Sequence, residues 1–113
     1  MKKILIVNAN YYKDVTDKLV KSSKNILKKR GLSVSVLIVP GIFEIPIAIR
    51  KNINKYEAFL AIGCVIKGKT PHFEFICKST FDAILNISIT YNKPIGNGII
   101  TALNQKQAAE RSG

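Results

Sequence analysis

The chain's single histidine, His72, follows the cationic loop Lys67-Gly68-Lys69-Thr70-Pro71. An imidazole can accept and donate protons near neutral pH, so a histidine in this setting could move protons during a reaction. Gly68, Thr70 and the start of the helix expected behind them offer backbone N–H groups and a positive dipole, which together suit an anion such as phosphate. The segment therefore suggests proton transfer beside a bound anion.

Three further side chains could take part in binding. Tyr11 follows the apolar run Lys3–Ala9, Glu44 follows the run Ser33–Val39, and Arg111 lies near the last residue of the chain. A tyrosine ring can stack on a planar substrate, a carboxylate can accept hydrogen bonds from hydroxyl groups, and a guanidinium matches the geometry of a phosphate. Such a set could serve one site if the fold brings it together.

The segment Gly63-Cys64-Val65-Ile66-Lys67-Gly68-Lys69-Thr70 also matches GxxxxGK[ST], the pattern of a nucleotide-binding P-loop. We reject that interpretation because Cys64, Val65 and Ile66 are apolar and continue a predicted strand, whereas a P-loop wraps around phosphates there. No predicted strand ends in Asp or Glu, so the carboxylate that usually helps to hold magnesium is missing as well.

Composition limits the remaining possibilities. At 113 residues, the chain favours a single domain that spans 1–113. One His and two Cys cannot form the usual four-ligand zinc site, and two Cys are too few for a disulfide scaffold. No apolar stretch approaches the roughly 18 residues of a membrane helix, and the N-terminus lacks a signal-peptide core. We therefore expect a soluble cytoplasmic protein with no membrane partner.

The net charge of +11 comes mostly from lysine, because only Arg30, Arg50 and Arg111 are arginines among the 18 cations. Abundant Lys, Ile and Asn together are typical of AT-rich coding, which we favour as the explanation. Attraction of a small anionic substrate and binding of a polyanion remain alternatives. Since nucleic-acid readers usually rely on arginine, we expect no nucleic-acid partner.

The chain alternates predicted strands and helices. Short, β-branched apolar runs typical of buried strands lie at Lys3–Ala9, Ser33–Val39, Ala58–Ile66 and 95–101. Helical patterns follow these runs: one that Asp14 or Thr16 can cap and Gly31 can end, then 44–52, 73–92 and 105–111.

Alternation of this kind predicts an α/β fold with a four-stranded parallel sheet and helices on both faces. In such sheets the ligand binds at the carboxyl ends of the strands. Tyr11, Glu44, His72 and Arg111 all come after predicted strands, so the topology predicts that they gather at this edge.

Several segments of the sequence resemble those of a known family. Residues 39–46 (VPGIFEIP) are similar to the VPGAFEIP segment of lumazine synthases, and residues 61–75 (AIGCVIKGKTPHFEF) are similar to their ALGAVIRGxTxHFxYV segment. Residues 94–101 and 107–113 resemble the family's fourth strand and its QAxxRxG helix. The resemblance covers nearly the whole chain, and the two central motifs together are highly specific.

The resemblance implies the penultimate step of riboflavin synthesis (EC 2.5.1.78). 5-Amino-6-(D-ribitylamino)uracil condenses with 3,4-dihydroxy-2-butanone 4-phosphate to give 6,7-dimethyl-8-ribityllumazine, phosphate and water. It also implies a flavodoxin-like strand order 2-1-3-4, no metal and no organic cofactor. The implied partners are other copies of the chain in a pentamer with active sites between subunits, and riboflavin synthase.

Roles for individual residues follow from the resemblance. His72 matches the proton-transfer histidine, and Tyr11 matches an aromatic that stacks on the pyrimidine. The remaining matches hold the ribityl chain and ring edge (Ile42, Phe43, Glu44), contact the ring largely through backbone (Cys64, Val65, Ile66) and bind phosphate (Lys69, Thr70, Arg111). The alternatives are structural: His72 as a helix-start residue, Tyr11 as a surface side chain, Glu44 as a helix-start charge and Arg111 as a solvated cation. We interpret Cys64 as a packing residue rather than a nucleophile.

The chain departs from the family pattern at three places. Asn97 stands where many members carry a Phe that covers the substrate from the neighbouring subunit; Asn97 could hydrogen-bond the pyrimidine instead. Tyr12 replaces a common Asn. The sequence ends at Gly113, before the Lys-containing segment and C-terminal helix of other members, so we expect a C-terminally short domain and a pentamer rather than a shell.

Two other functions remain as alternatives. One is a relative that binds a flavin or lumazine without turnover, because Asn97 and the short tail could impair the site. The other, more remote, is a basic nucleic-acid-binding module on the same fold, which would bind with a steep salt dependence.

Overall fold

The computed structural model describes residues 2–68 and 72–112. Its centre is a four-stranded parallel sheet in the order β2-β1-β3-β4. The strands are β1 (Lys3–Ala9), β2 (Ser33–Val39), β3 (Ala58–Ile66) and β4 (Ile95–Ala102). The predicted fold class and strand order are confirmed, and β4 runs one residue beyond its predicted end.

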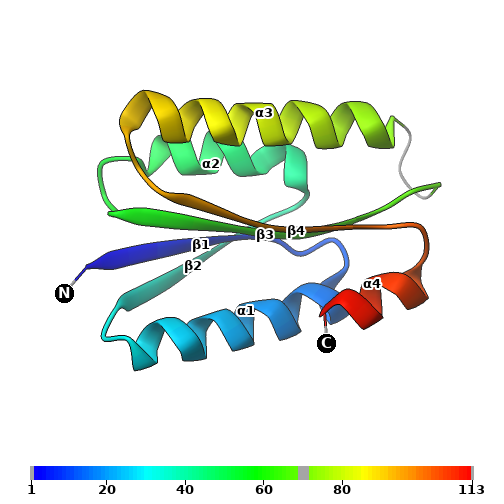
Figure 1. Ribbon diagram of the computed structural model, residues 1–113, viewed down its shortest axis with the longest axis horizontal. Coiled ribbons are helices and arrows are strands. Elements are labelled where there is room, and N and C mark those ends of the chain that lie inside the picture. The colour runs from blue at the N-terminus through cyan, green and yellow to red at the C-terminus, as the bar shows by residue number, and fades with distance from the viewer. Residues whose placement is uncertain (1, 69–71, 113) are drawn as a thin grey trace.

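Helices cover both faces of the sheet (Figure 1), as predicted. The helices α1 (Lys13–Lys29) and α4 (Gln105–Ser112) lie on one face, and α2 (Ile45–Lys51) and α3 (Phe73–Tyr91) lie on the other. A turn of 3₁₀ helix, η1 (Ile42–Glu44), precedes α2. The predicted start of that helix at Glu44 was wrong, because Glu44 N–H bonds back to the carbonyl of Gly41 and closes a tighter turn.

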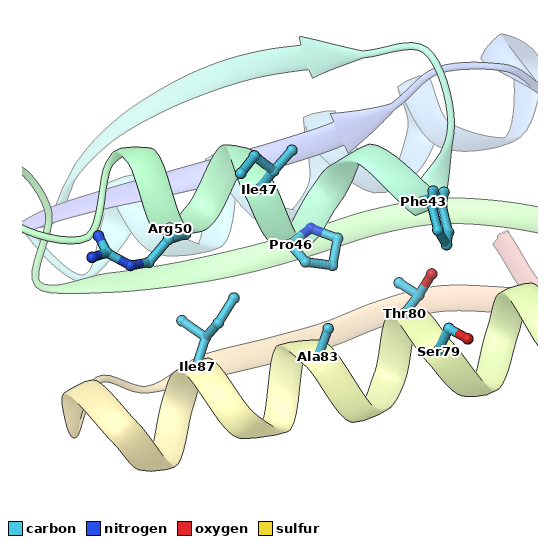
Figure 2. A pocket seen from close by; sticks show the side chains of 8 residues that line it. All are labelled: Phe43, Pro46, Ile47, Arg50, Ser79, Thr80, Ala83 and Ile87. Atoms are coloured by element: carbon cyan, nitrogen blue, oxygen red, sulfur yellow. The ribbon is translucent and has the colours of Figure 1, made fainter.

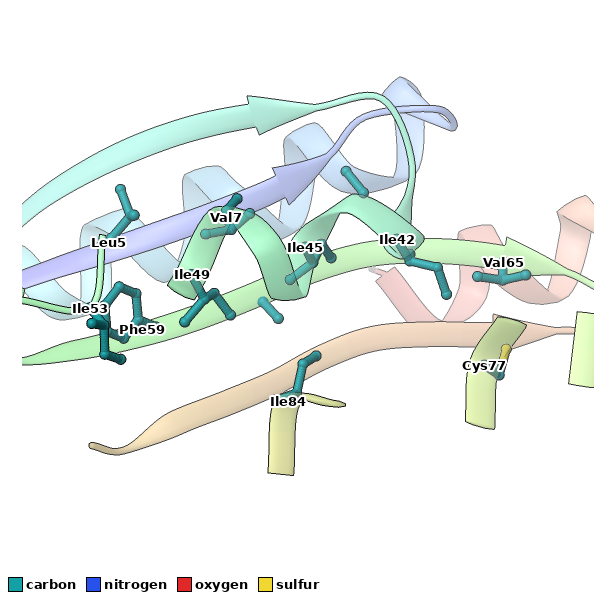
Figure 3. Close-up of a cluster of buried hydrophobic side chains, with 13 residues drawn as sticks. Leu5, Val7, Ile42, Ile45, Ile49, Ile53, Phe59, Val65, Cys77 and Ile84 are labelled. Atoms are coloured by element: carbon teal, nitrogen blue, oxygen red, sulfur yellow. The ribbon is translucent and has the colours of Figure 1, made fainter. Parts of the chain in front are cut away.

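The larger core lies between the sheet and the helices α2 and α3 (Figure 3). Inward-facing residues of β1 and β3 meet Ile45 and Ile49 from α2 and Cys77 and Ile84 from α3. Burying each large aliphatic side chain contributes about 1.5–3 kcal/mol. A smaller cluster on the opposite face joins the ends of β3 and β4 to α4 through Cys64, Ile66, Ala102 and Ala108.

The C-terminal end of α1 agrees with the prediction from the sequence, whereas its N-terminal end does not. Gly31 ends the helix in a left-handed conformation (φ +80°), and its N–H bonds to the carbonyl of Lys28. The prediction that Asp14 or Thr16 caps the start was wrong, because Tyr12 occupies the N-cap without a side-chain cap bond. Thr16 lies inside the first turns, is fully buried, and donates its hydroxyl to the carbonyl of Tyr12.

None of the helices in residues 2–68 and 72–112 is long and apolar enough to cross a membrane.

Candidate active site

The strand β3 extends past its neighbour β1 at the carboxyl edge of the sheet. Pairing between them ends at Asn8 opposite Ile62, whereas pairing with β4 continues to Ile66 opposite Ala102. The end of β3 at Ile66 therefore lies roughly 13 Å beyond Ile62, the last residue that pairs with β1. Its backbone edge on the β1 side has no strand partner in the described part of the chain, although Cys64, Val65 and Ile66 are each no more than 5% exposed.

The segment 42–44 lies beside this projecting strand. Ile42 is buried and packs over Gly63, where an added Cβ would come within 2.7 Å of Ile42 Cγ2. Phe43 is exposed and Glu44 is half-buried. Of the three predicted contact residues here, Phe43 and Glu44 can thus offer side chains, whereas the side chain of Ile42 packs against β3.

The first loop of the carboxyl edge carries two adjacent tyrosines. The ring of Tyr11 is largely exposed and meets the ring of Tyr12 edge-on, with 4.9 Å between centroids and an interplanar angle of 76°. Tyr12 is half-buried and packs against the smaller core cluster. The predicted stacking residue Tyr11 therefore stands at the same edge as the projecting part of β3.

His72 occupies the N-cap of α3. Its backbone is left-handed (φ 60°, ψ 35°), and its carbonyl accepts the N–H of Ile76. A left-handed non-glycine residue costs about 1–3 kcal/mol, and such strain is found preferentially at functional sites. The imidazole is exposed and makes no hydrogen bond within residues 2–68 and 72–112.

The predicted phosphate loop falls largely outside the described residues, which exclude Lys69 and Thr70. At its near end, Lys67 N–H bonds to the carbonyl of Ala102 and joins the loop to β4. The ammonium of Lys67 lies 3.8 Å from the carboxylate of Glu74, and both side chains are exposed. Such a pair contributes little to stability, but it adds a charged group of each sign at the start of α3.

Cys64 has the features of a packing residue. Its side chain is buried and free, and burial raises the pKa of its thiol. A raised pKa keeps the thiol protonated near neutral pH, which disfavours a nucleophilic role. The structure also supports the rejection of the P-loop interpretation. Residues 64–66 remain in β3, so the chain does not wrap around a phosphate there.

Asn97 lies apart from this group, whereas Arg111 lies near the carboxyl end of β4. Asn97 pairs with Ala61, which pairs in turn with Val7, so Asn97 sits at mid-height on the edge strand β4. Arg111 is on α4, on the face of the sheet opposite α3, and its guanidinium donates to the carbonyl of Thr101. One chain thus brings Tyr11, the segments 42–44 and 64–66, and His72 to one edge, without Asn97.

The placement of Arg111 depends on how α4 begins and packs. The side-chain oxygen of Asn104 accepts the N–H of Gln107, and the side-chain oxygen of Gln107 accepts the N–H of Leu103. This reciprocal pair satisfies two otherwise free donors at the helix start. Ala108 is fully buried in the smaller cluster, so α4 is held against the ends of β3 and β4 with Arg111 exposed.

A cavity of 380 Å³ between α2 and α3 was not foreseen from the sequence (Figure 2). Phe43, Pro46, Ile47 and Arg50 line one side, and Ser79, Thr80, Ala83 and Ile87 line the other. Thr80 is almost fully buried, and its hydroxyl has no hydrogen-bond partner in the described residues. The only sequence signal was the excess of large apolar residues along both helices.

Comparison with known proteins identifies one matching family model and several similar proteins. A protein-family model described as 6,7-dimethyl-8-ribityllumazine synthase matches residues 1–113. A protein of that name from Campylobacter curvus is 39% identical over 116 residues, which cover 98% of this chain and 74% of the relative. Those from Bartonella bacilliformis and Corynebacterium kroppenstedtii are 37% and 34% identical, with 74% and 70% of their lengths covered.

Proposed function

The chain belongs to the 6,7-dimethyl-8-ribityllumazine synthase family, and from this premise we propose how its residues carry out the family's reaction. The activity is lumazine synthesis in riboflavin biosynthesis. Its substrates are 5-amino-6-(D-ribitylamino)uracil and 3,4-dihydroxy-2-butanone 4-phosphate. The observation that carries the assignment of residues is the gathering of Tyr11, residues 42–44, residues 64–66 and His72 at one edge of the sheet.

His72 is the proposed proton-transfer residue. The amine of the pyrimidine attacks the ketone and forms an imine with loss of water, phosphate leaves by elimination, and the ribityl-bearing nitrogen closes the ring with loss of water. Each step moves a proton, and an imidazole both accepts and donates protons near neutral pH. The exposed ring at the N-cap of α3 supports this role.

The pyrimidine is proposed to lie between the tyrosine loop and the end of β3. The Tyr11 ring stacks on its face, and the unpaired backbone edge of Cys64, Val65 and Ile66 hydrogen-bonds its polar rim. Ile42, Phe43 and Glu44 hold the ribityl chain, for which the half-buried carboxylate of Glu44 accepts hydroxyl hydrogen bonds.

The phosphate is proposed to bind Lys69, Thr70 and Arg111. The α3 N-terminus adds a positive dipole next to this loop. Arg111 lies on the face opposite α3, so we propose that a neighbouring subunit supplies it. Asn97, on the outer strand of the sheet, is likewise proposed to reach the substrate of a neighbour.

We propose that the chain assembles as a homopentamer with active sites between subunits. Supporting this, large apolar residues are exposed on the side of the molecule formed by η1, α2 and α3: Phe43, Ile47, Phe75, Leu85 and Ile89 are each 55–70% exposed. An apolar surface of this kind normally marks an interface. The cavity between α2 and α3, with the unpartnered hydroxyl of Thr80, is proposed to receive side chains of the next subunit.

Three broader assignments complete the proposal. Residues 1–113 form a single domain, which the family match over that range supports. The enzyme acts in the cytoplasm, where its two free cysteines stay reduced. Riboflavin synthase, which consumes the lumazine, is a further partner.

Complementation tests the function in a cell. A bacterial strain that lacks lumazine synthase and requires riboflavin should grow without riboflavin when it expresses the 113-residue chain, and the His72→Asn variant should not restore growth. Failure of the unaltered chain to restore growth, although it accumulates in soluble form, would contradict the proposed function.

A further inference from the structure

The exposed ring of Tyr11 has one aromatic neighbour in the described residues. Tyr11 is 74% exposed, and its ring meets that of Tyr12 at 4.9 Å in an edge-to-face arrangement. A side chain so exposed would ordinarily sample several rotamers, and stacking on a substrate would have to fix it. Contact with a ring that is itself fixed removes part of that freedom before the substrate arrives.

Tyr12 is such a fixed ring. Its side chain packs against the cluster formed by Cys64, Ile66, Ala102 and Ala108. Its carbonyl accepts the N–H groups of Val15 and Thr16, both at 3.1 Å. Burial raises the pKa of the Tyr12 phenol, so the ring stays neutral and remains compatible with its apolar surroundings.

A cavity next to the two rings connects them with the end of β3. Its volume is 600 Å³, and Tyr11, Tyr12, Ile66 and the first turn of α1 are among its walls. Ile66 is the last residue of β3 and belongs to the segment proposed to contact the pyrimidine. The ring that fixes Tyr11 is therefore anchored on the same strand end that is proposed to bind the other side of the substrate.

We propose that Tyr12 is a positioning residue for the pyrimidine substrate, because its ring holds the ring of Tyr11 in the orientation that stacks on the pyrimidine. This inference rests on the proposed function, which gives Tyr11 its stacking role. Tyr12 itself does not touch the reacting atoms. Its contribution is to pre-order Tyr11 and thereby to raise the affinity for the pyrimidine.

The test is calorimetric titration of the purified protein with 5-amino-6-(D-ribitylamino)uracil, together with the KM values of both substrates. Tyr12→Ala and Tyr12→Leu should each raise the dissociation constant for the pyrimidine by about 2- to 10-fold, the range expected for loss of an aromatic pair. Tyr12→Phe keeps the ring and should bind as the unaltered protein does. The KM for the butanone phosphate should stay unchanged in all three.

Two further variants distinguish positioning from a purely structural role. Ile100 packs against the same cluster from β4 but has no aromatic ring to hold Tyr11, so Ile100→Ala should lower stability but leave the pyrimidine affinity unchanged. Since Tyr12 acts through Tyr11, the double variant Tyr11→Ala/Tyr12→Ala should bind the pyrimidine no more weakly than Tyr11→Ala alone.

Each opposing result has a defined meaning. Unchanged affinity in both Tyr12→Ala and Tyr12→Leu, or full additivity in the double variant, would overturn the inference about Tyr12 while leaving the role of Tyr11 in place. Unchanged affinity in Tyr11→Ala would overturn the proposed stacking residue, and the inference would fall with it.

Discussion

Ile42 and Gly63 approach each other so closely that no side chain fits between them. A Cβ built on Gly63 would lie 2.7 Å from Cγ2 of Ile42 and 3.4 Å from the Cβ of Ala9. Ile42 opens the segment that carries Phe43 and Glu44, and Gly63 directly precedes the projecting end of β3. This contact therefore sets the spacing between two parts of the proposed pyrimidine site.

Gly63→Ala should disturb both stability and binding. The methyl group would press on the β-branched Ile42, which is stiff at χ1 and buried, so the segment 42–44 has to move. We expect a loss of about 1–3 kcal/mol in the free energy of unfolding and a higher KM for the pyrimidine. Chemical denaturation and steady-state kinetics measure the two effects.

The double variant Gly63→Ala/Ile42→Ala provides the control. Ile42→Ala removes Cγ2 and should cost about 2–5 kcal/mol by itself, but adding Gly63→Ala to it should cost less than in the unaltered chain. Equal cost in both backgrounds would mean that the two residues do not oppose each other.

His72→Asn should lower kcat by about 10²- to 10⁴-fold, the usual contribution of a positioned acid–base group. Asparagine tolerates the left-handed backbone of this position better than other residues do, so the variant removes the imidazole with little change in the start of α3. Sedimentation should show the same particle as for the unaltered chain. A kcat within a few-fold of the original would assign the proton transfers to water or to substrate groups.

Arg111→Ala should mainly weaken the phosphate-bearing substrate. Loss of a charge-assisted hydrogen bond corresponds to about a 10- to 100-fold rise in the KM for the butanone phosphate. Arg111→Lys keeps the charge but loses the planar guanidinium, so its KM for the butanone phosphate should lie between those of the unaltered chain and Arg111→Ala. An equal rise in the KM for the pyrimidine would contradict the assignment of Arg111 to phosphate.

Ile89→Asp should break up the assembly. Ile89 is 70% exposed on α3, and a carboxylate in a buried interface would lose its hydration. We expect a smaller particle by native mass spectrometry and little activity, since the sites are proposed to need two subunits. Ile26, 53% exposed on α1 on the other face, is the matched control: Ile26→Asp should leave assembly and activity intact, and dissociation in both variants would argue against a specific interface.

The sheet could be predicted in detail because its signals are local. Apolar β-branched runs set the bounds of β1, β2 and β3 without error, and the alternation with helices set the parallel topology. Each of these features depends on residues close together in sequence.

The features that the sequence missed depend on packing between distant elements. Tyr12 appeared only as a departure from the family pattern, because its contact with Cys64, Ile66, Ala102 and Ala108 joins three elements. The turn at Ile42–Glu44 follows from the hydrogen bond of Glu44 to Gly41 rather than from propensity.

The central claim is that this chain makes lumazine with its own residues. Its most direct test mixes the purified protein with both substrates and follows the absorbance and fluorescence of 6,7-dimethyl-8-ribityllumazine together with released phosphate. We predict one phosphate per lumazine, and no lumazine when the butanone phosphate is omitted. Tight binding of the pyrimidine without any lumazine would contradict the claim and would identify a non-catalytic binding protein.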